Sequence, residues 1–175
     1  MHTLKRMMNL VLLMPLSLVL FSCSAPNTDE AATSTTSSGP DIKGTYELVS
    51  RQLPDGTLLK PPAVAGLYTY TETRRNFNIV EEDAMGKNFV SMAASYTFTP
   101  TEYTQTRIFR TTTDASDRSK VVYDGPGETL TSEVKIEGGR IEFKLPGDEP
   151  TLVFEGTTMT ATEPGSFIDV WEKVP

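Results

Sequence analysis

Cysteine and histidine are almost missing from this chain of 175 residues, which has one of each, Cys23 and His2. Because both lie near the N-terminus, the rest of the chain can form no internal disulfide, no thiolate or histidine zinc site and no proximal-histidine haem site. It also lacks the imidazole and thiolate groups of the common nucleophilic enzymes. We therefore expect a protein that is not an enzyme and has no cofactor or metal site; only carboxylate, lysine or tyrosine acid–base chemistry stays open.

Basic residues are also scarce, since 16 lysines and arginines stand against 23 aspartates and glutamates, for a net charge of −7. Nucleic acids and anionic lipid surfaces attract clusters of basic side chains. An acidic chain is therefore not expected to bind nucleic acid. We expect one folded domain, for which the chain is long enough, and a monomer.

Long hydrophobic runs are limited to residues 10–21, which Pro15 and Ser17 interrupt. A membrane-spanning helix needs roughly 20 apolar residues, so a transmembrane segment is the weaker alternative. Basic residues precede the run and small residues follow it, as in a secretory signal peptide. The sequence therefore predicts a signal peptide over residues 1–22.

The end of this segment, Leu20-Phe21-Ser22-Cys23, resembles the lipobox of bacterial lipoproteins. The resemblance implies that the chain is cut before Cys23 and that Cys23 carries a diacylglycerol and an N-acyl group such as palmitate. Several acyl chains hold a protein to a membrane essentially permanently, whereas one chain binds reversibly. Ser24 resembles the residue of outer-membrane lipoproteins, so we expect the outer membrane of a bacterial envelope and a domain facing the periplasm. The alternatives are exposure at the cell surface and an unmodified thiol.

Residues 24–40 contain no aromatic and no large aliphatic side chain. Such a segment cannot bury enough apolar surface to offset the entropy lost on ordering. Residues 23–41 are therefore predicted to be a flexible tether that begins at the lipidated cysteine. The folded domain is predicted over residues 42–175.

In this domain, short stretches rich in Thr, Val, Tyr and Phe alternate with turn residues about every 8–12 positions, which is typical of antiparallel β-sheet. Apolar and polar residues alternate in residues 89–99 and 129–137, as in half-buried strands. Gly138-Gly139 predicts a two-residue hairpin, and residues 58–66 are predicted to be a loop. About eight strands would close an all-β, antiparallel up-and-down barrel that can hold one small ligand.

Three short segments of the domain resemble the lipocalin-like domains of the calycin type. They are residues 44–50 (GTYELVS), where the family has Gly-x-Trp before an apolar strand, residues 66–70 (GLYTY) and residues 170–174 (VWEKV). The resemblance implies a closed barrel in which Tyr46 replaces the family's tryptophan across the closed end and Trp171 shares that role. An unrelated β-sandwich is the alternative fold.

A set of aromatic and sulfur-containing side chains on the central strands could line an apolar ligand cavity or could simply fill the core. Tyr96 and Phe98 point to the same side as Met92, which favours these residues for the cavity. The full set of candidates consists of Tyr68, Tyr70, Phe77, Met92, Tyr96, Phe98, Tyr103 and Phe109.

Two groups of arginines, Arg74 with Arg75 and Arg107 with Arg110, lie in predicted strands. Neighbouring residues of a strand point to opposite faces, so one of each group could point inward. An inward arginine could hold a ligand carboxylate through two parallel hydrogen bonds, and Arg107 is our candidate for this role. The alternative is a solvated strand edge with weak surface ion pairs.

Two other polar stretches are predicted to be turns. The acidic run Glu81-Glu82-Asp83 lacks the spacing of a calcium loop, and Gly125-Pro126-Gly127 lacks the strand-to-helix context of a phosphate loop. Neither stretch is therefore expected to bind a ligand.

These features together predict a non-catalytic, lipid-anchored envelope lipoprotein whose barrel binds a small hydrophobic or amphipathic ligand. A second hypothesis is a protein-interaction or inhibitor lipoprotein with a solid barrel or sandwich, whose loops at residues 58–66 and 114–119 contact a partner. An enzyme that uses carboxylates or tyrosines is the third, although the sequence shows no pair of acids placed for such chemistry.

Overall fold

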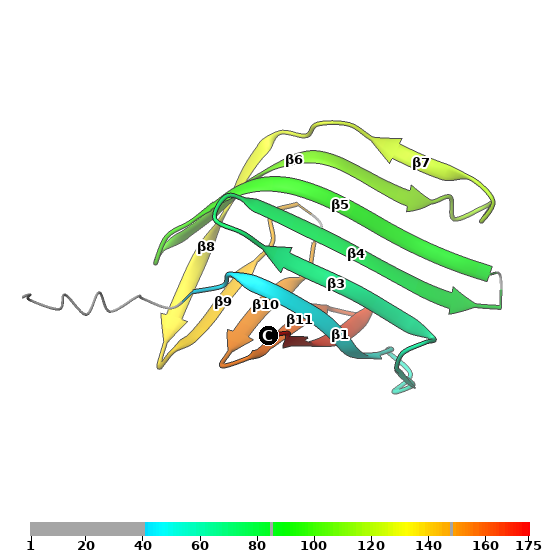
Figure 1. The fold of residues 1–175 in the computed structure, drawn as a ribbon, viewed down its shortest axis with the longest axis horizontal. Helices are drawn as coiled ribbons and strands as arrows, with labels where there is room; N and C mark the ends of the chain where they lie inside the picture. The colour runs from blue at the N-terminus through cyan, green and yellow to red at the C-terminus, as the bar shows by residue number, and fades with distance from the viewer. Residues whose placement is uncertain (1–40, 85, 148) are drawn as a thin grey trace, which may run out of the picture. The chain divides into compact units, whose positions relative to one another are not determined.

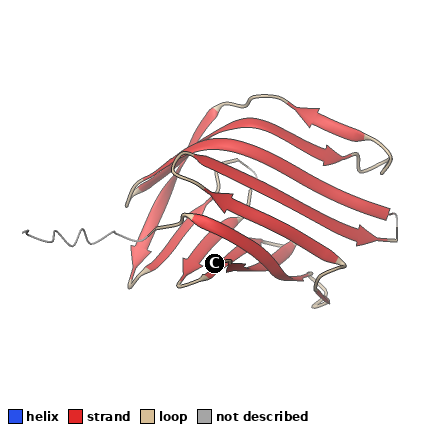
Figure 2. Cartoon of the chain, viewed as in Figure 1, coloured by secondary structure: helices blue, strands red, loops and turns tan. Residues whose placement is uncertain are grey.

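The computed structural model describes residues 41–84, 86–147 and 149–175. The predicted signal peptide (residues 1–22), the predicted lipidation site Cys23 and the predicted tether up to residue 40 lie outside the described residues. The described domain consists of strands joined by turns and loops, without a helix (Figures 1 and 2). Within the described ranges, no helical segment has the length and hydrophobicity that crossing a membrane requires.

Twelve strands make up the described domain, and every hydrogen-bonded pair of neighbours is antiparallel. In chain order they are β1 (Gly44–Gln52), β2 (Leu58–Leu59), β3 (Val64–Tyr70), β4 (Arg74–Asp83), β5 (Gly86–Phe98), β6 (Glu102–Thr113), β7 (Val121–Asp124), β8 (Thr129–Glu137), β9 (Arg140–Lys144), β10 (Thr151–Glu155), β11 (Thr158–Glu163) and β12 (Phe167–Lys173).

The sheet closes on itself because β12 pairs with β1. Among the described residues, ten strands form the ring, in the order β1, β3, β4, β5, β6, β8, β9, β10, β11 and β12. The short strands β2 and β7 pair with β1 and β6 and lie outside the ring. The predicted all-β antiparallel barrel is thus confirmed, with ten strands instead of about eight. The short C-terminal stretches all form strands, because each finds a hydrogen-bonded partner on both edges.

The predicted hairpin at Gly138-Gly139 is also confirmed. It joins β8 to β9, and its two glycines have φ angles of +59° and +87°, as a tight turn with two left-handed residues requires. Residues 58–66, in contrast, are only partly a loop. Leu58 and Leu59 pair with the end of β1, and Val64 begins β3, since backbone groups beside a strand edge are best satisfied by pairing.

The end of the barrel at which β1 begins is filled by aromatic side chains. Tyr103 and Phe143 stack with their ring centroids 4.5 Å apart. Phe154 lies 5.8 Å from Phe143 and 5.6 Å from Tyr46, centroid to centroid. Such pairs contribute roughly 0.5–1.5 kcal/mol each beyond the area that they bury. We call this region the closed end, because its interior is solid.

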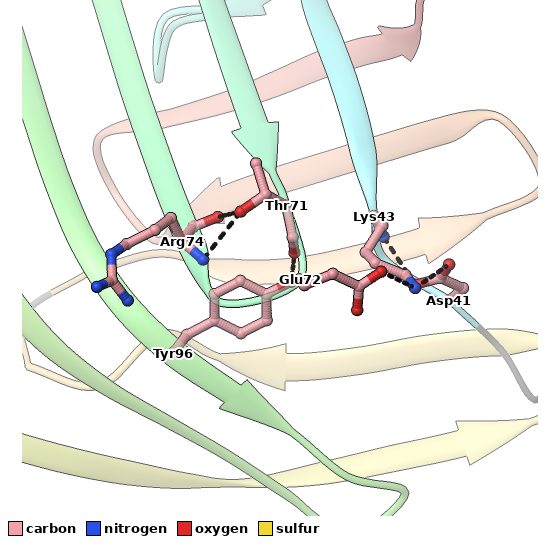
Figure 3. A network of polar contacts seen from close by, with 6 residues as sticks. All are labelled: Asp41, Lys43, Thr71, Glu72, Arg74 and Tyr96. Atoms are coloured by element: carbon pink, nitrogen blue, oxygen red, sulfur yellow. Dashed lines mark hydrogen bonds and ion pairs between the residues drawn. The ribbon is translucent and has the colours of Figure 1, made fainter.

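Polar contacts tie the turn after β3 to its neighbours at the closed end (Figure 3). The Tyr96 hydroxyl on β5 donates a hydrogen bond to the Thr71 carbonyl. Lys43 Nζ lies 2.9 Å from a carboxylate oxygen of Glu72 and 3.5 Å from one of Asp41. Tyr96 therefore supports this end with both its ring and its hydroxyl, whereas the exposed Lys43 pairs add little stability.

Gly66 on β3 marks a close approach between the sheet and the ring of Trp171. A Cβ atom at Gly66 would lie 2.8 Å from the Asn78 carbonyl oxygen and 2.8 Å from Cη2 of Trp171. Trp171 is fully buried and meets the Tyr68 ring edge to face at 5.7 Å. Only glycine leaves room for the indole at this position.

We expect Gly66→Ala to lower the free energy of unfolding by about 1–3 kcal/mol, because the added methyl group must displace the buried Trp171 ring. Gly125→Ala is the matched control, since its Cβ would meet only the Tyr123 ring at 3.9 Å. Urea unfolding followed by tryptophan fluorescence measures both variants. Equal stability of the two would show that Gly66 is not tightly packed.

Buried tyrosines make the fold sensitive to alkali. Burial raises the pKa of Tyr46 to about 12, and it also raises the pKa of Tyr68, Tyr70, Tyr96 and Tyr103. An unfolded tyrosine has a pKa of about 10. Between about pH 10 and 12 the folded protein therefore keeps protons that the unfolded chain releases, so stability is complete below this range and falls as pH rises through it.

We expect tyrosinate absorbance and the loss of circular dichroism to appear together above about pH 10, in one cooperative step. The measurement should use a Tyr123→Phe background, so that only the buried tyrosines are observed, because Tyr123 is 65% exposed. Ionisation of the remaining tyrosines while the barrel is still folded would contradict this expectation.

Candidate functional site

A cavity of about 570 Å³ occupies the half of the barrel beyond the aromatic closed end. Small-molecule sites have volumes of roughly 300–1,000 Å³, so the cavity has room for one small ligand. Arg110 and Leu130 line it and are exposed, so it opens to solvent. Its apolar lining includes Phe77 and Ile79 of β4, Val90 and Met92 of β5, and Trp171 of β12.

A buried arginine forms the polar part of the cavity floor. Arg75 on β4 is 1% exposed, and its terminal nitrogens donate hydrogen bonds to the Gln105 side chain and to Glu149, the latter over 2.6 Å. Its Cζ lies 5.1 Å from the centre of the Tyr68 ring. A buried cation is tolerated only when it is paired and hydrogen-bonded. Both terminal nitrogens of Arg75 are therefore occupied within the protein.

A second arginine, Arg51 on β1, joins three strands in the cavity wall. Its Nε and one terminal nitrogen donate to the two carboxylate oxygens of Asp169 on β12, over 2.7 and 2.8 Å. The other terminal nitrogen donates to Glu81 on β4 over 2.8 Å, and Cζ lies 4.4 Å above the Phe167 ring. Burial raises the pKa of Asp169, while the charge of Arg51 opposes that rise. All three guanidinium nitrogens of Arg51 are thus engaged.

A β-bulge in β1 brings Arg51 into the cavity. The pairing of β1 with β12 shifts between Leu48 and Ser50, so Val49 is the extra residue, and it is 42% exposed. Leu48 points inward before the bulge and Arg51 points inward after it. Strict alternation would have placed Arg51 on the outer face, because an inserted residue reverses which set of side chains faces inward.

A second bulge, in β6, has the same effect on Arg107 and Arg110. Arg107 and Phe109 pair with adjacent residues of β5, so Ile108 is the extra residue. Strict alternation would put only one of the two arginines inside, yet both line the cavity. Phe109, predicted as a cavity residue, is half-buried and is not part of the cavity lining. That prediction was wrong, because the bulge changes which residues point inward.

Arg107 is held in place by the segment between β7 and β8. Its Nε donates to the Gly125 carbonyl over 3.4 Å, and a Cβ at Gly127 would lie 3.3 Å from Nε. Residues 125–127 were predicted to form a turn. They are instead an extended break, because β7 and β8 pair with the same edge of β6 and the chain does not reverse. Among the residues that the structure describes, neither Arg107 nor Arg110 forms an ion pair.

The predicted ligand-binding residues divide into two groups by their height along the barrel. Tyr68, Phe77, Met92 and Arg107 line the cavity, whereas Tyr70, Tyr96, Phe98 and Tyr103 pack in the closed end. Alternation predicts the face to which a side chain points but not its height. It therefore cannot separate lining from filling residues.

The two residues predicted to close the barrel also lie at different heights. Tyr46 lies at the closed end, where Lys173 Nζ is 5.9 Å from its ring centre. Trp171, two residues before Lys173, reaches the cavity floor beside Tyr68 and Phe77. Only Tyr46 therefore has the position that the family resemblance implies.

Several polar residues of the site were not among the predicted ligand-binding residues. Glu81 was expected in a solvated turn, but it lies in β4 and binds Arg51, so that prediction was wrong. Asp169 occupies the inward row between Phe167 and Trp171, and a carboxylate within an apolar row is a signal that could have identified it. Gln105 carries the same signal, because it lies in the inward row of β6 between Tyr103 and Arg107. Glu149 gave none, because it lies between β9 and β10 and meets Arg75 only in the folded barrel.

Comparisons of the chain with models of protein families, with curated proteins and with solved structures found no match. Within the described ranges, no group of three His, Cys, Asp or Glu side chains is arranged to hold a metal ion.

We expect Asp169→Asn to lower the free energy of unfolding by about 1–3 kcal/mol, because an amide cannot replace the paired carboxylate that faces Arg51. Glu142→Gln is the control, since its ion pair with Arg140 is much more exposed and should contribute less than about 1 kcal/mol. Chemical denaturation compares the two. Equal, small losses would show that the Arg51 network does not hold β12 to β1.

Proposed function

We propose that this chain is a lipid-anchored lipoprotein of a bacterial envelope whose barrel binds a small hydrophobic or amphipathic molecule without catalysis. The observation that carries this proposal is the cavity of about 570 Å³ inside a closed barrel. A core that served stability alone would be packed to a density similar to that of an organic crystal. A hollow of this size gives up packing contacts that a solid core would make, so stability alone does not explain it.

The distribution of side chains along the barrel supports a binding role. The closed end is filled by stacked aromatic rings, so the cavity has a floor and a single half of the barrel contains it. Its walls combine apolar side chains with a few charged groups, which is the usual make-up of small-molecule sites. Such a pocket can remove most of a small ligand from water.

The position of the first described residues is compatible with an anchor at Cys23. β1 runs from Tyr46 at the closed end to Arg51 beside the cavity. A tether that enters β1 therefore reaches the barrel at the end away from the cavity. With Cys23 lipidated in the outer membrane and the domain in the periplasm, the cavity opening would stay free to exchange its ligand.

A second candidate function, protein interaction, is favoured by the exposed strand β7. β7 pairs with β6 alone, and its side chains Val121, Val122 and Tyr123 are 58%, 39% and 65% exposed. An exposed edge with apolar side chains can accept a strand from another chain. This candidate predicts a partner but no bound small molecule.

Native mass spectrometry of the whole chain, purified gently from a bacterial host, tests the carrier function. We expect a mass shift from one small apolar or amphipathic molecule, which organic extraction can then identify. Val90→Trp should abolish the shift, because the larger ring fills the cavity. Val80→Trp is the matched control, since Val80 is on the neighbouring strand and 44% exposed.

A mass without any bound molecule, together with no thermal stabilisation by fatty acids, alcohols or phospholipids, would overturn the carrier function. Protein interaction through β7 would then be the better-supported function. Retention of the bound molecule in Val90→Trp would show that binding occurs outside the cavity.

A further inference from the structure

Two arginine side chains of the cavity lining, Arg107 and Arg110, form no ion pair with any residue that the structure describes. From this we infer that the ligand of the cavity is an amphipathic anion. Arg107 and Arg110 hold the anionic group, a carboxylate or a phosphate, and the apolar wall formed by Phe77, Val90 and Met92 holds the rest of the molecule. This inference rests on the proposed carrier function and adds the chemical class of the ligand.

The four arginines of the lining differ in whether a carboxylate of the protein pairs with them. Arg51 is bound by Asp169 and Glu81, and Arg75 is bound by Glu149 and Gln105. Both are therefore neutralised inside the protein. Arg107 and Arg110 have no carboxylate within ion-pairing distance among the described residues. Two guanidinium groups beside a pocket are the usual means of holding a carboxylate or a phosphate.

The bulge at Ile108 is what places both groups in the cavity. Without it, Arg107 and Arg110 would lie on opposite faces of β6, since they are three residues apart. With it, Arg107 pairs with Ala94 and Arg110 with Met92, and both of these β5 residues point inward. The two charges therefore stand on one face and on adjacent inward positions.

The segment between β7 and β8 orients the first of these groups. The Gly125 carbonyl accepts a hydrogen bond from Arg107 Nε, while the absence of a side chain at Gly127 lets the guanidinium pack against the backbone. The terminal nitrogens of Arg107 keep no partner among the described residues. An arginine held by Nε alone offers its two terminal nitrogens to a pair of ligand oxygens.

The apolar wall continues directly from the arginines across three strands. Arg110 on β6 pairs with Met92 on β5, which pairs with Phe77 on β4. Neighbouring strands are about 4.8 Å apart, so the wall extends roughly 10 Å from the charged group. A molecule with an anionic head and a hydrocarbon tail fits this arrangement, with its head at the arginines and its tail along the apolar wall.

Two acidic residues of the lining, Glu128 and Glu163, also lack an ion pair among the described residues. Glu128 immediately precedes β8 and Glu163 ends β11, so they do not share a strand face as the arginines do. Glu128 follows Gly127, which packs against Arg107. Removing the charge of Glu128 therefore tests whether the ligand is an anion or a cation.

Binding of four probes with the same alkyl chain tests the inference: dodecanoate, dodecyl phosphate, dodecanol and dodecyltrimethylammonium. The protein is the full chain with Cys23→Ser, which removes only the predicted lipid attachment, stripped of bound lipid and titrated by calorimetry. We expect both anions to bind at least about tenfold more tightly than dodecanol. The ratio of dodecanoate to dodecyl phosphate affinity distinguishes a carboxylate from a phosphate ligand.

The double variant Arg107→Gln/Arg110→Gln should lose about tenfold or more in affinity for the anions and little for dodecanol. Glu128→Gln should strengthen anion binding, because it removes a repelling charge. Arg74→Gln, an exposed arginine at the start of β4, is the matched control. The single variants Arg107→Gln and Arg110→Gln repeat the measurement if the double variant melts early.

Three results would overturn the inference, and they are distinguishable. Equal affinity for dodecanoate and dodecanol, unchanged by the arginine variants, would support the carrier function but exclude an anionic ligand. Binding of dodecyltrimethylammonium more tightly than of the two anions, weakened by Glu128→Gln, would show that the ligand is a cation. Binding of none of the four probes would count against the carrier function itself, and the inference would fall with it.

Discussion

A strand inside a closed barrel must keep its hydrogen bonds on both edges, and the bulges at Val49 and Ile108 are where two strands take up an extra residue without breaking the ladder. Each bulge reverses which residues point inward. Arg51 enters the cavity after the first and Arg110 after the second. The charge inside this barrel is therefore a consequence of backbone register as much as of residue type.

The buried charges in turn require the polar partners that surround them. Arg75 would be unstable in an apolar floor, and Gln105 and Glu149 supply its acceptors from two distant parts of the chain. Arg51 holds Asp169 and Glu81 in the same way. The Arg75 network lies in the floor between the solid aromatic end and the hollow end, whereas the Arg51 network joins three strands of the cavity wall. Arg107 and Arg110 differ from these two arginines, because neither forms an ion pair with a described residue.

The predictions from sequence succeeded where the cause is local. The alternation in residues 129–137 and the glycine pair after it set a hairpin that needs nothing beyond its own turn geometry. They failed where a residue's position depends on strand pairing or on a partner far away in the chain. Phe109 was expected to point inward, and this was wrong because no residue pattern in the sequence indicates the bulge at Ile108. Glu81 was expected in solvent, and this was wrong because its partner Arg51 lies 30 residues away in the chain.

The sequence by itself determined the class of fold, the inward and outward faces of most strands, the turn made by the glycine pair at 138–139 and the absence of histidine and cysteine chemistry from the barrel. These follow from each residue and its near neighbours. Only the tertiary structure decided that ten strands close the ring and which aromatic residues fill one end. It also decided that the other end holds a cavity, lined by two arginines that pair with no carboxylate in the described part of the chain. Packing is a property of all the strands together, so no single stretch of the chain contains it.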